Sequence, residues 1–212
     1  MEEKEISQAV IGRLPRYLRY LGELKDEGIE RVSSQELSEI MQVTASQIRQ
    51  DLNTFGGFGQ QGYGYNVNFL HEEIRKILGL DKAHRLILVG AGNLGQALVN
   101  YTNFERRGFL FCGVFDKDPK VCGKEIRGLL VRPMEEMDSF VRKNGIDIAV
   151  LAIPKSSAVE VAGQLAACGI RGIWNFAHVD LKVPAHIQVE NVHLSDSLMK
   201  LSYNLSSAVY EG

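Results

Sequence analysis

Long hydrophobic runs are missing from this 212-residue sequence, and cysteines are few. No apolar stretch approaches the roughly 18 to 20 residues of a membrane span, and the acidic start MEEKEIS lacks the basic and apolar regions of a signal peptide. The three cysteines, Cys112, Cys122 and Cys168, have no CxxC spacing, which favours reduced buried thiols over disulfides or a zinc site and leaves a redox-active thiol as the alternative. We therefore expect a folded cytoplasmic protein.

Excess charge of one sign is lacking as well. The net charge is −2, with nine basic and twelve acidic side chains in residues 1–80 and fifteen and fourteen in residues 81–212. This balance argues against indiscriminate binding of polyanions, so any nucleic-acid function needs a local basic face. The five histidines show no HExxH or other ligand spacing, and no metal site is predicted.

The larger part of the chain alternates short apolar runs with amphipathic stretches, which is the pattern of βαβ units around a parallel sheet. We expect helices near 93–104, 133–144 and 156–169. The expected strands are 85–90, 109–116, 128–131, 146–153, 170–176 and 187–194. The sequence thus predicts an α/β fold with an open parallel sheet of about six strands.

A glycine fingerprint follows the first expected strand and opens a helix. Gly90 allows a tight turn, Gly92 lets a pyrophosphate approach the backbone, and Gly95 lets helix and strand pack closely. The start of the helix offers N–H donors to phosphates. The predicted cofactor-binding turn is Gly90, Ala91, Gly92, Asn93, Leu94 and Gly95. The alternative is that the glycines only tighten a turn.

An acidic residue stands where such a site needs one. Asp116 ends the second strand 21 positions after Gly95, where its carboxylate can accept hydrogen bonds from the adenine ribose and repel a 2′-phosphate. We therefore predict NAD(H) rather than NADP(H), a preference that the neighbouring Lys117 weakens. Pro154, in the loop after the 146–153 strand, is a further candidate contact or a plain helix start.

Little in the sequence supports hydride transfer. The 132 residues from Asp81 onward are about what one sheet of this kind needs, so no substrate domain is left over. His178, just after a strand, is the one candidate acid or base, and a structural role explains it better. We predict no catalytic residues and a domain that binds a dinucleotide without turning it over.

The amino-terminal third predicts a helix-turn-helix. Leucines at helical spacing mark a helix over 15–28 that starts at Pro15, and SSQELSEIM (33–41) carries a capping-box pattern. A short turn leads to a third helix over 44–55, whose buried stripe would be Ile48, Leu52 and Phe55. In this arrangement the last helix lies in the major groove of DNA.

Polar side chains remain on the outward face of that third helix. Amides and arginine are the groups that read base edges, and the glycine-rich segment 56–67 could form a hairpin, or wing, around Gln60 and Gln61. Arg13, Arg16 and Arg19 give the first helix a cationic face for phosphates. The DNA-binding candidates are Arg13, Arg16, Ser46, Gln47, Arg49, Gln50, Asn53, Gln60, Gln61 and Tyr63. A protein-interaction or dimerisation module is the alternative.

These blocks together resemble the Rex family of redox-sensing transcriptional repressors. The resemblance runs in order through RLPRYLRYL (13–21), ASQIRQDLNTFGGFGQQGYGYNV (45–67), LILVGAGNLGQAL (86–98), VFDKDPKVCGKEI (114–126) and VPAHIQVENVHLSDSL (183–198). It implies a winged-helix DNA-binding domain over 1–80, a Rossmann-like NAD(H)-binding domain over 81–194, and a carboxy-terminal helix over 195–212 that is exchanged within a homodimer.

The resemblance also implies the regulation. NADH would release the protein from a palindromic operator of the TTGTG…CACAA type, upstream of genes of anaerobic or fermentative metabolism, whereas NAD+ would bind more weakly and permit DNA binding. Tyr101 would lie near the cofactor by family position. The chain departs from many relatives at Gln50, Gln60 and Gln61, which replace basic residues, so the salt dependence of DNA binding should be shallower.

Two other functions stay open at this point. One is an NAD-dependent oxidoreductase, which the missing substrate domain disfavours. The other is a module that binds a different nucleotide, such as CoA or an adenosine phosphate.

Overall fold

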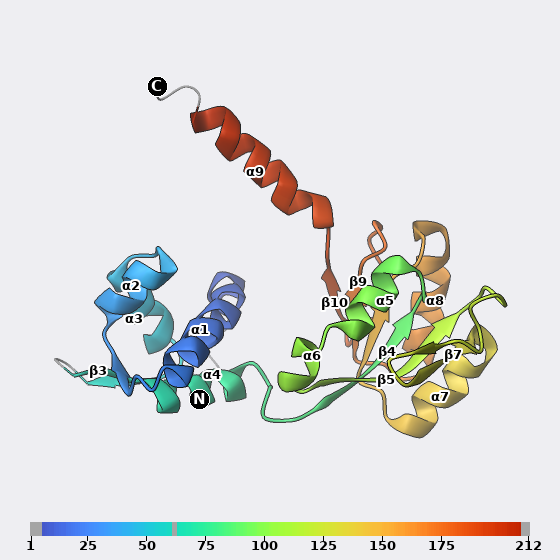
Figure 1. Cartoon of the computed structure of the whole chain (residues 1–212), viewed down its shortest axis with the longest axis horizontal. Helices are drawn as coiled ribbons and strands as arrows, with labels where there is room; N and C mark the ends of the chain where they lie inside the picture. Colours follow the sequence, from blue (N-terminus) through green and yellow to red (C-terminus); the bar gives the residue numbers. More distant parts are fainter. Residues whose placement is uncertain (1–5, 61–62, 209–212) are drawn as a thin grey trace. The chain divides into compact units, whose positions relative to one another are not determined.

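The structure is a computed structural model that describes residues 6–60 and 63–208. The chain divides into two compact units, residues 1–82 and 83–212. The first unit, blue to teal in Figure 1, consists of α1 (Gln8–Asp26), β1 (Arg31–Val32), α2 (Ser34–Met41), α3 (Ala45–Asn53), β2 (Gly59–Gln60), β3 (Gly64–Asn66) and α4 (Val67–Ile77).

Side-chain caps start the helices of the first unit. The Ser33 hydroxyl accepts from the Glu36 N–H while the Glu36 carboxylate accepts from the Ser33 N–H, which is the predicted capping box. Thr44 caps α3 by accepting from the Gln47 N–H at 3.1 Å. Each such cap stabilises a helix by about 1 kcal/mol. The predicted helices at 33–41 and 44–55 are therefore confirmed.

The first helix differs from its prediction. The sequence predicted a start at Pro15, but α1 begins at Gln8, where Ser7 caps it, and Pro15 lies inside the helix. Pro15 is exposed, so the helix continues past it at the cost of one backbone hydrogen bond on the solvent side. Pro15 therefore does not mark the start of this helix, contrary to the prediction from the sequence.

Apolar faces of four helices meet in the core of the first unit. Leu21 of α1, Leu37 of α2, Leu52 of α3 and Ile74 of α4 are fully buried there. The small sheet beside them has the order β1-β3-β2 with antiparallel pairs, so β2 and β3 form the predicted hairpin after α3. This unit is a helix-turn-helix with a wing.

The second unit is built from alternating strands and helices. Its elements, green to red in Figure 1, are β4 (His84–Val89), α5 (Asn93–Asn100), α6 (Asn103–Arg106), β5 (Phe109–Asp116), β6 (Glu125–Ile126), β7 (Leu129–Pro133), the 3-10 turn η1 (Met134–Glu136), α7 (Met137–Asn144), β8 (Ile148–Leu151), α8 (Lys155–Ala167), β9 (Gly172–Asn175), β10 (Gln188–Asn191) and α9 (Leu194–Ala208).

The sheet of this unit has the order β10-β9-β8-β4-β5-β7-β6. All neighbours pair in parallel except β6 and β7, which form an antiparallel hairpin at one edge. The six parallel strands follow the Rossmann order, in which the chain reverses direction across the sheet beside β4. Ligands of such sheets bind at the carboxyl ends of the strands next to that reversal. The predicted fold class is confirmed.

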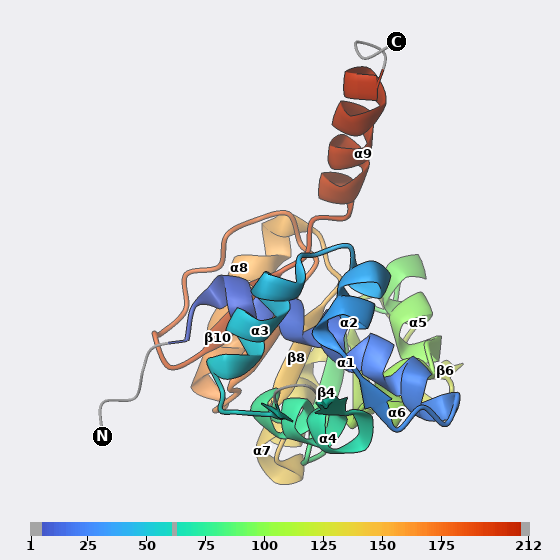
Figure 2. The ribbon, with the colours of Figure 1, turned by 90° about the vertical axis from the view of Figure 1, so that its left-hand side faces the viewer.

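Helices cover both faces of the sheet (Figures 1 and 2). Side chains alternate along β4, so that Ile87 packs with α7 and α8, and Leu88 packs with α5. The predicted helix over 93–104 is two helices, because the chain leaves helical geometry at Tyr101 (φ −79°, ψ 98°).

The last helix, α9, presents apolar side chains to solvent. Leu198, Met199 and Leu205 are 67%, 61% and 64% exposed, respectively, and none of them belongs to an apolar core of its own unit. Exposed apolar stripes of this kind are typical of helices that pack against another surface. Within residues 6–60 and 63–208, no helix has both the length and the apolar character that a membrane crossing requires.

Candidate nucleotide site and DNA interface

The turn after β4 needs glycine at two of the three fingerprint positions. Gly90 has φ +101°, and a Cβ there would overlap the carbonyl oxygen of Ala152 on the neighbouring strand loop. A Cβ at Gly95 would overlap the Gly90 carbonyl oxygen and lie 2.9 Å from Leu88 Cδ2. A Cβ at Gly92 would meet no described atom within 4 Å. Gly90 and Gly95 therefore shape the turn, and Gly92 leaves space beside it.

Asp116 fixes this turn from the end of β5. Its Oδ2 accepts a hydrogen bond from the Ala91 N–H at 2.6 Å, and its Oδ1 accepts from the Asp118 N–H at 2.9 Å. The Ala91 carbonyl in turn accepts from Gln96 Nε2 at 2.7 Å. The carboxylate is held in one orientation beside the first turn of α5, where the helix N-terminus favours negative groups.

A pocket of about 350 Å³ opens beside this turn. It lies within the size range of small-molecule sites. It brings together five predicted residues from three separate loops, namely Gly90, Gly92, Asp116, Lys117 and Pro154.

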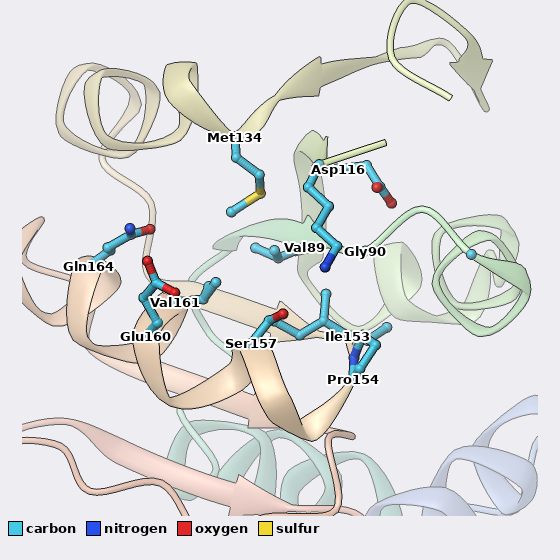
Figure 3. A pocket seen from close by; sticks show the side chains of 13 residues that line it. Val89, Gly90, Asp116, Met134, Ile153, Pro154, Ser157, Glu160, Val161 and Gln164 are labelled. Atoms are coloured by element: carbon cyan, nitrogen blue, oxygen red, sulfur yellow. The ribbon is translucent and has the colours of Figure 1, made fainter. Parts of the chain in front are cut away.

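Sequence reasoning missed the opposite walls of this pocket. Met134 approaches from the end of β7, and Ser157, Glu160 and Val161 approach from α8 (Figure 3). Gln164 lies one turn further along α8. The helix predicted after β8 could have indicated that residues of α8 line the pocket, whereas nothing in the sequence indicated Met134.

Other predicted cofactor residues lie outside the lining of this pocket. Ala91, Asn93 and Leu94 belong to the turn and the start of α5. Tyr101 lies at the far end of α5, where it is 51% exposed, its ring packs on Phe104, and its hydroxyl accepts from Asn103 Nδ2 at 3.1 Å. A role for Tyr101 near the cofactor stays a prediction.

The cysteines and His178 lie outside the pocket lining. All three cysteines are free; Cys168 is buried, and Cys112 and Cys122 are half-buried. Burial raises the pKa of Cys168 to about 11 and also raises that of Cys122, which keeps both as thiols at neutral pH. His178 is exposed and stacks on His193, with 3.3 Å between the Nδ1 atoms.

The outward face of α3 forms a shallow polar depression. It is lined by Ser46, Arg49, Gln50, Asn53 and Thr54. The Arg49 Nη1 donates to the Ser34 hydroxyl at 3.0 Å, so α2 holds this guanidinium at the surface. Four of the predicted DNA-binding residues, Ser46, Arg49, Gln50 and Asn53, thus share one exposed face of α3.

Two predicted DNA contacts, Arg13 and Gln47, donate hydrogen bonds to a buried carboxylate. Arg13 donates from Nε and Nη2 to the two oxygens of Asp51, each at 2.7 Å, and Gln47 Nε2 donates to Asp51 Oδ1 at 2.8 Å. Asp51 is fully buried. The Arg13 guanidinium is therefore the charge partner of a buried carboxylate, and its contact with a DNA phosphate stays a prediction.

The remaining candidates lie on α1 and the wing. Arg16 and Arg19 approach the Tyr20 ring at 5.9 and 5.0 Å, which keeps both cations at the surface. Tyr63 is 70% exposed, and Arg31 lies over its ring and donates to its carbonyl at 3.2 Å. Gln61 lies outside the described residues, as does the side chain of Gln60.

Comparison with known proteins matches both units to families. Residues 5–53 match the family "Putative DNA-binding protein N-terminus", and residues 81–179 match the family "CoA binding domain". The chain is 56% identical over 205 residues to the redox-sensing transcriptional repressor Rex of Thermoanaerobacter pseudethanolicus, covering 97% of this chain and 92% of that protein. The chain belongs to the Rex family.

A second Rex relative, from Clostridioides difficile, is 57% identical over 200 residues, covering 94% of this chain and 95% of the relative. Such relatives are transcriptional repressors rather than enzymes, in agreement with the prediction of no catalysis. The chain is a redox-sensing repressor of this kind, and the oxidoreductase alternative is withdrawn.

Solved Rex structures resemble the whole chain. The crystal structure of RSP in complex with β-NAD+ and operator DNA matches with a TM-score of 0.92 and 54% identity, covering 99% of this chain and 97% of that one. The structure of RSP with β-NADH matches with a TM-score of 0.90 and 51% identity, covering 99% of each chain. RSP thus binds the two ligands that the resemblance to the Rex family implies, a nicotinamide dinucleotide and operator DNA.

Proposed function

We propose that this chain binds a palindromic operator as a homodimer and leaves it when NADH occupies the pocket beside Gly92. The observation that carries the proposal is that one chain contains two features. The first is a glycine turn of the dinucleotide-binding type, fixed by Asp116, and the second is a helix-turn-helix whose third helix exposes a polar face. A relative of 54% identity combines β-NAD+ with operator DNA.

In this proposal the pocket takes the adenosine half of NAD(H). The α5 N-terminus and the open space at Gly92 favour the pyrophosphate. The Asp116 carboxylate accepts from the ribose hydroxyls and disfavours a 2′-phosphate. Pro154 and Lys117 bound the adenosine from two other loops, and the nicotinamide extends toward the far side of the turn.

The DNA half of the proposal rests on the face of α3. Arg49, Gln50 and Asn53 would read base edges in the major groove, and Ser46 would lie nearest the backbone at the start of the helix. The segment with Gln60, Gln61 and Tyr63 would form the wing. Arg16 on α1 would contact a phosphate. Because Gln50, Gln60 and Gln61 are uncharged, these contacts release fewer counterions than those of a more basic relative, and the salt dependence of the affinity is shallower.

Dimerisation through α9 completes the proposal. The exposed leucine stripe suits an exchange of residues 195–212 between two chains. The second unit offers an apolar groove of about 410 Å³ lined by Phe104, Ile148 and Trp174, which suits such a helix. Two reading helices are needed because one helix-turn-helix covers a short site, and a two-fold protein matches a palindrome. The domain divisions at 80 and 194 and a cytoplasmic location belong to the same proposal.

NADH and DNA are coupled in this scheme by linkage. If NADH binds the state with low DNA affinity more tightly, then operator DNA weakens NADH binding by the same factor. NAD+ binds both states more evenly and so leaves the repressor on DNA.

The test is fluorescence anisotropy of a labelled TTGTG…CACAA duplex titrated with the protein, alone and with NADH, NAD+ or CoA in excess. We expect specific binding that NADH alone abolishes. Release by CoA and not by NADH would assign the pocket to a different nucleotide. Arg49→Ala should remove operator binding and leave NADH affinity unchanged, whereas equal loss of both would indicate a folding defect.

A further inference from the structure

Asp51 is a buried carboxylate on the inner side of the reading helix. Besides its bonds with Arg13 and Gln47, its Oδ2 accepts from the Tyr17 hydroxyl at 3.0 Å. Arg13 and Tyr17 lie on α1, whereas Gln47 lies on α3 one turn before Asp51. One carboxylate therefore joins two helices and also holds a side chain of the reading helix.

The charge of Asp51 decides which way the Gln47 amide faces. Burial would raise the pKa of Asp51, but the hydrogen bonds from Arg13, Gln47 and Tyr17 outweigh burial and hold the pKa below its ordinary value. An ionised carboxylate only accepts hydrogen bonds. A flipped amide would place the Gln47 oxygen against the Asp51 oxygen, so the NH2 group must face Asp51 and the oxygen must point away from it.

The oxygen of this amide reaches the surface. Gln47 is half-buried, and within the described residues its Oε1 accepts no hydrogen bond. No buried side-chain nitrogen or oxygen in the same residues lacks a partner, so Oε1 cannot be a buried atom. The exposed depression on α3 is lined by Ser46, the residue before Gln47, and by Gln50, one helical turn after it.

We infer that Asp51 is a positioning residue that makes Gln47 a hydrogen-bond acceptor toward the operator. The inference rests on the proposed DNA-binding function. In the major groove, adenine N6 and cytosine N4 are the donors, whereas guanine O6 and thymine O4 are acceptors. Gln47 therefore selects a strand position that carries an amine, and Asp51 sets this preference without touching DNA.

The test compares operators in which each base pair of the half-site is changed in turn. Gln47→Ala identifies the position that Gln47 reads, where we expect a loss of about tenfold in discrimination. Asp51→Asn, whose amide can pair with either end of Gln47, should remove the same preference and leave the other positions unchanged. A uniform loss of affinity with the preference intact would overturn the inference, because it would show that Asp51 acts only on folding.

Two further variants separate positioning from stability. Tyr17→Phe removes one hydrogen bond of Asp51 but leaves Gln47 in place, so it should lower the melting temperature and keep the base preference. Loss of that preference in Tyr17→Phe would refute the positioning role. If Asp51→Asn does not fold, the double variant Arg13→Met, Asp51→Leu replaces the ion pair by apolar groups, which proteins tolerate better than a lone buried charge.

This double variant is expected to show the loss of preference seen in Gln47→Ala, and retention of the preference would overturn the inference. A wild-type protein that binds no operator would refute the proposed function, and the inference with it. If the wild type and Asp51→Asn show the same base preference at the position that Gln47 reads, the inference is refuted but the proposed function is not.

Discussion

Replacing Gly95 by alanine should damage the fold and the nucleotide site together. The new Cβ would lie 2.9 Å from Leu88 Cδ2 and closer still to the Gly90 carbonyl oxygen, whereas ordinary contacts begin near 3.4 Å. The carbonyl belongs to the main chain and cannot rotate away as the Leu88 side chain can, so the start of α5 must move from β4, and overpacking of this kind costs about 1 to 3 kcal/mol. In a chain of this length that lowers the melting temperature by roughly 2 to 4 °C per kcal/mol.

The matched control is Gly92→Ala, in which the added methyl group meets no described atom within 4 Å. It should lower the melting temperature less than Gly95→Ala does, because the only loss is the N-cap preference of glycine over alanine, about 0.5 to 1 kcal/mol. Both variants should weaken NADH by about tenfold or more, because charge-assisted hydrogen bonds to the phosphates are disturbed. Fluorescence titration of NADH and a thermal scan give both quantities. Gly92→Ala with wild-type NADH affinity would refute the close approach of a pyrophosphate.

Three further predictions concern charge, pH and assembly. Asp116→Asn keeps only one of the two acceptor oxygens that hold the turn, so it should lower the melting temperature, weaken NADH by about tenfold and narrow the preference for NADH over NADPH, measured by competition. Unchanged selectivity would show that the carboxylate charge does not act on the ligand. The pKa of Asp51 is lower in the folded protein than its ordinary value of 3.8, so the ionised carboxylate stabilises the fold at any pH above that value. This stabilisation is lost as the pH falls through the folded pKa. The difference in unfolding free energy between the wild type and Asp51→Asn, measured by denaturant unfolding, should therefore shrink as the pH falls below about 4. Leu198→Asp with Leu201→Asp should yield monomers in sedimentation experiments and weaken operator binding; dimers of full affinity would exclude α9 from the interface.

Local patterns were sufficient to predict much of the fold. The capping box at Ser33 and the fingerprint at Gly90–Gly95 are short-range features, in which each residue satisfies its neighbours, so their structures follow from sequence spacing. The alternation of apolar runs predicted the parallel strands for the same reason. The strand at 128–131 was predicted and corresponds to β7, but its hairpin partner β6 was missed because two residues with one apolar position carry almost no periodic signal.

Long-range partners explain most of what the sequence could not predict. Asp51 lies next to the buried Leu52, and the helical pattern alone did not reveal that Arg13, 38 positions earlier, would make its burial possible. For the same reason the sequence did not show that the Gln47 amide donates to Asp51. Met134 and Gln164 line the pocket through the folding of distant elements, which no local motif encodes.

The obstacles at Gly90 and Gly95 have a consequence for engineering. Each missing methyl group would overlap a main-chain carbonyl, and no compensating side-chain change elsewhere can remove a carbonyl. Attempts to retune a fluorescent NADH biosensor built from this unit should therefore leave these two positions untouched. The adjustable residues are those whose side chains line the cavity, such as Lys117, Ile153 and Glu160. Changes there alter ligand affinity by degrees, so a graded series of sensors becomes accessible from a single scaffold.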